Sequence, residues 1–140
     1  MNSVADFPIN SHLGMKYDED KKILSLPENE RVMNYFGQVS FCAQFALAEA
    51  SSAQFLTDKL GLDLSSEIPT LRKSTTKFHK PTNGKSICNL ISIEHTREEF
   101  KELLSKKSKV LTSIEVEVVS ENGTKSLSSS FQWLILKLNP

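Results

Sequence analysis

Cysteine is scarce in this chain of 140 residues, which contains only Cys42 and Cys88. The two lie far apart in apolar segments and show no metal-ligand spacing, so we expect free, buried thiols in a reducing compartment. This excludes a disulfide-rich secreted domain. The three histidines form no cluster with metal spacing either, and we expect no metal.

An excess of charge is also missing, because 17 basic residues balance 17 acidic ones. This balance gives no reason to expect nucleic acid or an anionic membrane as a partner. Residues 1–14 lack a basic n-region and an apolar h-region, so we expect no signal peptide. The apolar stretch 35–57 contains too many polar residues for a membrane span. We therefore expect a cytoplasmic protein with one domain over residues 1–140.

Charged side chains are absent from residues 35–57 with the single exception of Glu49. Since 24% of the whole chain is charged, a segment with one carboxylate is expected to be a helix enclosed by other structure. Burial of a carboxylate is costly without a partner, and it raises the pKa of the group. Glu49 is therefore either part of a buried structural network or a catalytic base, and both interpretations stay open.

The uncharged segment has clear helix boundaries. Ser40 is a candidate N-cap and Gly61 a candidate stop, so we expect a central helix over about residues 40–60. A shorter amphipathic helix is expected over residues 96–106, because it opens with the capping-box pattern Thr-x-x-Glu.

Alternating apolar residues predict six strands, two before the central helix and four after it. They are expected at residues 12–17, 22–26, 71–79, 86–93, 110–119 and 125–138. Turn residues at 81–84 and 121–123 suggest that consecutive strands pair as hairpins. The prediction is an α+β fold in which an antiparallel sheet wraps around one long central helix.

This order of elements and the helix sequence resemble the hotdog fold, in particular the small acyl-CoA thioesterases of the phenylacetate-pathway type. Asn34 stands six residues before Ser40, and the Leu-Ala-Glu on the helix places Glu49 nine residues after Ser40, as in that family. Gly37 and the Phe-x-x-Pro-x-x-Gly at residues 78–84 match a glycine before the helix and a hairpin after it in related hotdog proteins.

The resemblance implies a thioesterase that uses a CoA thioester as substrate or ligand, with no cofactor. Glu49 would activate a water or attack the carbonyl directly. The side-chain amide of Asn34 and the N–H groups of Phe41 and Cys42 would stabilise the oxyanion at the helix N-terminus. The remaining residues of the implied substrate-binding set are Gly37, Ser40 and Ser52.

Helix geometry adds a constraint on this mechanism. Phe41 and Glu49 are eight residues apart, which is roughly 12 Å along one helix. Both groups need contacts of about 3 Å to one carbonyl, so the oxyanion donors must come from a second subunit. We expect a homodimer with two composite sites, while the sequence leaves a tetramer open.

Residues 68–93 contain basic side chains and no acid. Such a run either meets the phosphates of CoA or forms a solvated strand face. The candidate phosphate-binding residues are Arg72, Lys73, Lys77, Lys80 and Lys85.

The chain departs from the resemblance at the start of the helix, where Ser40-Phe41-Cys42 replaces His-Gly-Gly. This favours an alternative, a hotdog module that binds acyl-CoA without cleaving it. A hydratase or dehydratase ranks third, because no His precedes the helix acid in the expected loop. A cysteine hydrolase using Cys42 with His79 ranks last.

Overall fold

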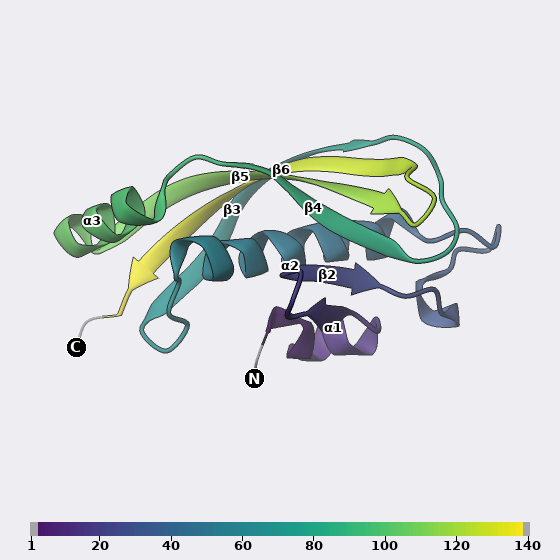
Figure 1. The fold of residues 1–140 in the computed structure, drawn as a ribbon, viewed down its shortest axis with the longest axis horizontal. Coiled ribbons are helices and arrows are strands. Elements are labelled where there is room, and N and C mark those ends of the chain that lie inside the picture. The colour runs from purple at the N-terminus through teal and green to yellow at the C-terminus, as the bar shows by residue number, and fades with distance from the viewer. Residues whose placement is uncertain (1–2, 139–140) are drawn as a thin grey trace.

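The computed structural model describes residues 3–138 and shows a curved sheet wrapped around the long helix α2 (Figure 1). The elements in chain order are η1 (Val4–Asp6), α1 (Pro8–His12), β1 (Lys16–Asp18), β2 (Ile23–Leu26), η2 (Glu30–Val32), α2 (Phe41–Leu60), β3 (Glu67–Phe78), β4 (Ser86–Ile93), α3 (Arg97–Lys107), β5 (Lys109–Ser120) and β6 (Lys125–Lys137).

All neighbouring strands are antiparallel, in the order β1-β2-β4-β5-β6-β3. The predicted antiparallel sheet around one central helix is therefore confirmed. The turn at residues 121–123 joins β5 and β6 as a true hairpin, with Gly123 at φ +88°. The two end strands of the sheet differ greatly, since β1 has three residues and β3 has twelve.

The hairpin expected at residues 81–84 is wrong. β5 and β6 lie between β3 and β4 in the sheet, so this segment crosses from one region of the sheet to another. It is held by Val39 N–H donating to the Thr82 carbonyl (3.0 Å) and His79 N–H donating to the Ser126 carbonyl (2.8 Å). Pro and Gly mark the end of a strand whether or not the flanking strands pair, so the signal could not identify the partner.

Two strand boundaries also differ from the prediction. The segment expected as a strand from residue 12 begins as helix α1, which has Pro8 in its first turn, and β1 starts only at Lys16. β3 starts at Glu67 rather than at residue 71 and includes Pro69. Proline is tolerated there because β3 is an edge strand with a neighbour on one side only.

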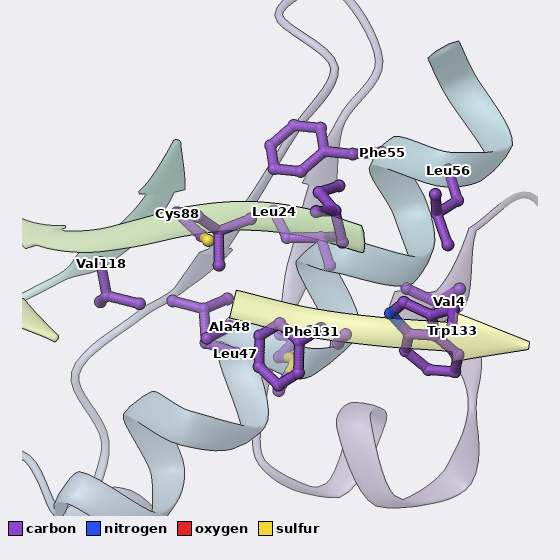
Figure 2. Close-up of a cluster of buried hydrophobic side chains, with 14 of the residues drawn as sticks. Val4, Leu24, Leu47, Ala48, Phe55, Leu56, Cys88, Val118, Phe131 and Trp133 are labelled. Carbon is purple, nitrogen blue, oxygen red and sulfur yellow. The ribbon is translucent and has the colours of Figure 1, made fainter. Parts of the chain in front are cut away.

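Helix α2 begins and ends where the sequence predicted. The Ser40 hydroxyl accepts the Cys42 N–H at its start, and Gly61 adopts φ +70° at its end. The capping box of α3 is also present. Leu47 and Ala48 of α2 are fully buried against the sheet, where Phe131 and Trp133 of β6 contribute large core side chains (Figure 2). No helix within residues 3–138 is long and apolar enough to cross a membrane.

Candidate functional site

Glu49 lies near the middle of α2, half-buried, with its side chain at a cavity of about 180 Å³. Burial raises the pKa of the Glu49 carboxyl above its ordinary value of 4.5. No hydrogen bond or ion pair from residues 3–138 offsets that desolvation. Within the described part of one chain, the structural-network interpretation of Glu49 therefore has no network to support it.

Apolar side chains form most of the cavity beside Glu49. Ala50 and Ala53 of α2 lie on the helix side, and Trp133 of β6 lies on the sheet side. Phe7, which precedes α1, contributes from the N-terminal segment. A carboxylate next to an apolar cavity is suited to act as a base on a substrate that carries an apolar group.

Ser52 lies one turn after Glu49 and is fully buried. Its hydroxyl donates to the Glu49 backbone carbonyl (2.7 Å) and accepts the indole N–H of Trp133 (2.9 Å). The single hydroxyl proton is thus already used inside the fold. Ser52 connects the helix that presents Glu49 to the tryptophan that lines the same cavity.

We expect Ser52→Ala to destabilise the protein, because it leaves the buried Trp133 N–H without an acceptor. The expected loss is about 1–3 kcal/mol in the free energy of unfolding, measured by denaturant titration. A Trp133→Phe background removes the donor, so there the same change is expected to cost clearly less. Equal losses in both backgrounds would contradict this pairing.

Asn34 lies in the tight turn before α2. Its side-chain oxygen accepts the backbone N–H groups of Phe36 (2.9 Å) and Gln38 (3.0 Å). These two donors fix the amide orientation, so the NH₂ group is directed away from the turn as a hydrogen-bond donor. No acceptor among residues 3–138 pairs with that NH₂ group.

The two predicted backbone donors at the start of α2, the N–H groups of Phe41 and Cys42, differ in whether they are already hydrogen-bonded. The Phe41 N–H has no acceptor among residues 3–138, as expected for the first turn of a helix. The Cys42 N–H, in contrast, donates to the Ser40 hydroxyl at 3.2 Å. Phe41 also packs its ring against Phe78, at 5.0 Å between centroids. Of the two helix donors, the Cys42 N–H is therefore already hydrogen-bonded within residues 3–138, and the Phe41 N–H is not.

Gly37 occupies the tip of the same turn at φ +77°, a conformation that favours glycine. It is exposed, and no atom lies within 4 Å of where a Cβ would be. The preceding residues Tyr35 and Phe36 stack on each other and are 90% and 71% exposed.

The predicted site residues thus form two separate groups on one chain. Asn34, Gly37, Ser40, Phe41 and Cys42 gather at the N-terminal end of α2. Glu49 and Ser52 lie two to three turns further along, roughly 12 Å from Phe41 along the helix axis. A single chain does not bring the acid and the donors to one carbonyl.

The five basic candidates are all exposed, and they do not form one cluster. Arg72 and Lys73 line an open groove of about 580 Å³ on β3, and Lys77 lines a different groove of about 400 Å³. Lys80 and Lys85 belong to the connection between β3 and β4. At the rise of a strand, Arg72 and Lys80 are roughly 25 Å apart, which is too far for one phosphate group.

Among residues 3–138, neither thiol is hydrogen-bonded to a histidine. The expectation that both thiols are buried is wrong for Cys42, which lies in the first turn of α2 and is exposed. His79 pairs through Nε2 with the Ser128 hydroxyl at 2.9 Å. Cys88 is buried, which raises the pKa of its thiol to about 12. Residues 3–138 contain no group of three or more His, Cys, Asp or Glu side chains positioned for a metal ion.

Solved structures of other proteins share this architecture. A Pseudomonas aeruginosa protein described as a probable thioesterase superposes with a TM-score of 0.78 at 16% identity, covering 96% of this chain and 91% of its own. The fold is the hotdog fold. Because the sequence identity is low, this likeness establishes the hotdog architecture and not the reaction. No family model matches the chain, and no curated protein matches it.

Two further hotdog neighbours add detail. A Bacillus halodurans protein determined with CoA has a TM-score of 0.70 at 15% identity, covering 91% of this chain and 75% of its own. A Staphylococcus aureus thioesterase, determined with a Glu-to-Ala substitution, has a TM-score of 0.69 at 14% identity, covering 93% and 99%. A second structure of the same protein carries a Gln-to-Ala substitution instead.

Sequence reasoning missed part of the surroundings of Glu49. Val4 and Phe7 contribute to its cavity from a segment with no periodic pattern, so nothing in the sequence connected them to the helix. The pairing of Ser52 with Trp133 joins residues that are 81 positions apart, and no local signal predicts such a contact.

Proposed function

We propose that this protein hydrolyses acyl-CoA thioesters at two composite sites formed by two copies of the chain. Glu49 of one copy acts as the general base on a water or as the nucleophile. The Phe41 N–H and the Asn34 amide of the other copy stabilise the negative charge on the thioester oxygen. The products are a carboxylic acid and the free thiol of CoA.

The observation that carries the proposal is the environment of Glu49. A half-buried carboxylate without a partner is destabilising, and desolvation makes it a stronger base. It faces a cavity whose other walls are mainly apolar, where an acyl group would place its carbonyl near the carboxylate. A purely structural acid would be expected to have hydrogen-bond donors around it.

Support for a composite site comes from the free edge of β3. This strand has twelve residues, pairs only with β6 and leaves its other row of backbone N–H and C=O groups open in the described chain. Pairing of two β3 edges about a twofold axis would continue the sheet and reverse the direction of the partner's α2. The N-terminus of one α2 would then approach the later turns of the other.

The neighbouring structures support CoA as part of the ligand and also support the pairing of an amide residue with an acid. The Bacillus halodurans protein was determined with CoA, which fits a CoA thioester as the substrate here. In the Staphylococcus aureus thioesterase, the substituted Glu and Gln have residue numbers that differ by 15. Asn34 and Glu49 of this chain are separated by the same interval, with an amide first and an acid second.

The test is a thiol-release assay with a series of acyl-CoA substrates, carried out across a range of pH. The proposed role of Glu49 predicts how kcat/KM depends on pH. Since Glu49 must be ionised to act, kcat/KM is expected to fall as pH decreases through the pKa of Glu49. Burial raises this pKa, so the midpoint of the acid limb is expected above 4.5. Release of no thiol from any acyl-CoA between about pH 4 and 9 would contradict the proposal.

A second candidate is a module that binds acyl-CoA without hydrolysing it. The engaged Cys42 N–H favours it, because only one helix donor remains for an oxyanion. The two functions separate in one experiment. Thermal stabilisation by an acyl-CoA without thiol release supports the binding module, and thiol release supports the thioesterase.

A further inference from the structure

The N-terminal segment, residues 3–13, forms one side of the partly open cavity beside Glu49. Val4 and Phe7 of this segment line it together with Ala50 and Ala53 of α2. Trp133 completes the wall from the sheet, and Figure 2 shows it beside Val4. The segment packs on α2 from the side away from the main sheet (Figure 1).

Buried and partly buried hydrogen bonds hold this segment against the helix. The Val4 N–H donates to the side-chain oxygen of Gln54 (2.9 Å), whose NH₂ group donates to Asp58 (3.1 Å). Asp58 also accepts the hydroxyl of Tyr17 from β1 (2.9 Å). Val4 is buried, and the Asn10 amide adds a bond to its carbonyl (2.8 Å). The wall is therefore a fixed part of the fold.

Two polar side chains of the cavity, Asn10 and Thr57, donate hydrogen bonds to backbone carbonyls of the protein. The Thr57 hydroxyl donates to the Ala53 carbonyl (3.1 Å), and the Asn10 amide donates to Val4. The cavity is mainly apolar, with Asn10 and Thr57 beside the Glu49 carboxylate as the polar side chains of its lining. Such a lining selects a hydrocarbon group rather than a polar one.

Volume then limits the length of that hydrocarbon. The part of this cavity that one chain forms measures about 180 Å³. An engineered apolar cavity of roughly 150 Å³ in another protein holds one benzene molecule, so the space here accommodates about six carbon atoms. A fatty acyl chain twice that length would exceed this volume.

We infer that the cavity beside Glu49 is the acyl pocket and that the N-terminal segment limits the substrate to apolar acyl groups of about six carbons or fewer. This inference rests on the proposed thioesterase function and adds the substrate class. Phe7 is a specificity-determining residue in this account, and Ala53 is a small residue of the same lining that leaves room in the cavity.

The experiment compares kcat/KM for straight-chain acyl-CoA substrates from acetyl to dodecanoyl in wild type and three variants. In wild type, we expect hexanoyl-CoA to exceed dodecanoyl-CoA by at least about a hundredfold. Phe7→Ala enlarges the cavity and is expected to raise the dodecanoyl-to-hexanoyl ratio at least about tenfold. Ala53→Leu fills the cavity and is expected to lower the hexanoyl-to-acetyl ratio by a similar factor.

Ile9→Ala provides the matched control, since Ile9 lies on α1, is 64% exposed and is not among the cavity-lining residues. It is expected to keep the wild-type profile. If Phe7→Ala fails to fold, Ala53→Leu tests the same pocket in the opposite direction and preserves good helix propensity.

The outcomes separate this inference from the function on which it rests. Thiol release at equal efficiency for all chain lengths, or a wild-type profile in Ala53→Leu, would overturn the acyl pocket while the thioesterase stands. No thiol release from any substrate would overturn the thioesterase and this inference with it. A shift of the kcat/KM profile toward longer acyl chains in Phe7→Ala, with the wild-type profile kept in Ile9→Ala, would support the pocket.

Discussion

Replacing Glu49 with Gln is expected to lower kcat for acyl-CoA hydrolysis by at least about a hundredfold, the usual contribution of a general base. Gln has nearly the same shape as Glu, so the cavity and the packing of α2 are expected to persist. The measurement is thiol release at saturating substrate, with dimer formation checked by light scattering. Glu115→Gln, at an exposed position on β5, is the control and is expected to keep wild-type kcat.

The same variant is expected to be at least as stable as wild type at neutral pH. The folded-state pKa of Glu49 is raised above its unfolded value, so the folded state binds the proton more tightly. The stability that this group contributes is therefore complete below the unfolded pKa and is lost as pH rises through the folded pKa. Above that pH the ionised group destabilises the fold, and Gln removes this penalty.

Thermal unfolding of wild type and Glu49→Gln across pH measures this effect. The melting temperature of the variant is expected to exceed that of wild type at pH 7–8, and the difference is expected to shrink below about pH 4. A variant that is less stable at neutral pH but retains full kcat would identify Glu49 as a structural acid. That result would remove Glu49 from the mechanism.

Local signals explain why much of the fold was predictable. Ser40, Gly61 and the capping box of α3 are chemical requirements of helix ends, and each lies where the sequence predicted. The alternation in β5 and β6 reflects burial of one sheet face, and the structure buries those positions. Strand partners depend on distant contacts instead, which is why the connection at 81–84 was misread as a hairpin.

The candidate site was only partly predictable for a related reason. A lone acid in an uncharged helix can be recognised in the sequence, because burial of an unpaired carboxylate costs free energy and such residues are therefore rare. Its cavity is not visible, since Phe7, Ala53 and Trp133 come from three distant segments. Two sequence predictions also conflict at the helix start, because an N-cap serine accepts the N–H of the second or third helical residue. As the N-cap, Ser40 engages the Cys42 N–H that was expected to be an oxyanion donor.

A heterodimer of two inactive variants is expected to recover about half of wild-type activity if each site combines two chains. Asn34→Asp is the partner of Glu49→Gln in this test. It keeps the side-chain oxygen that accepts the Phe36 and Gln38 N–H groups, and it removes the NH₂ donor. Loss of an oxyanion donor typically lowers kcat by 10²–10³-fold, so each parent homodimer is expected to be nearly inactive.

The arithmetic follows from the twofold symmetry. In the heterodimer, one site combines Glu49 of the first chain with Asn34 of the second and is intact, while the other site carries both substitutions. Co-expression with two affinity tags isolates this species for the thiol-release assay. A heterodimer of Asn34→Asp with the Asn34→Asp/Glu49→Gln double variant contains no intact site and is the control.

Because α2 separates Phe41 from Glu49 by roughly 12 Å, recovery is required by the composite mechanism. A heterodimer as inactive as its parents would show that both residues act within one chain, and the composite site would be wrong even if the protein hydrolyses acyl-CoA.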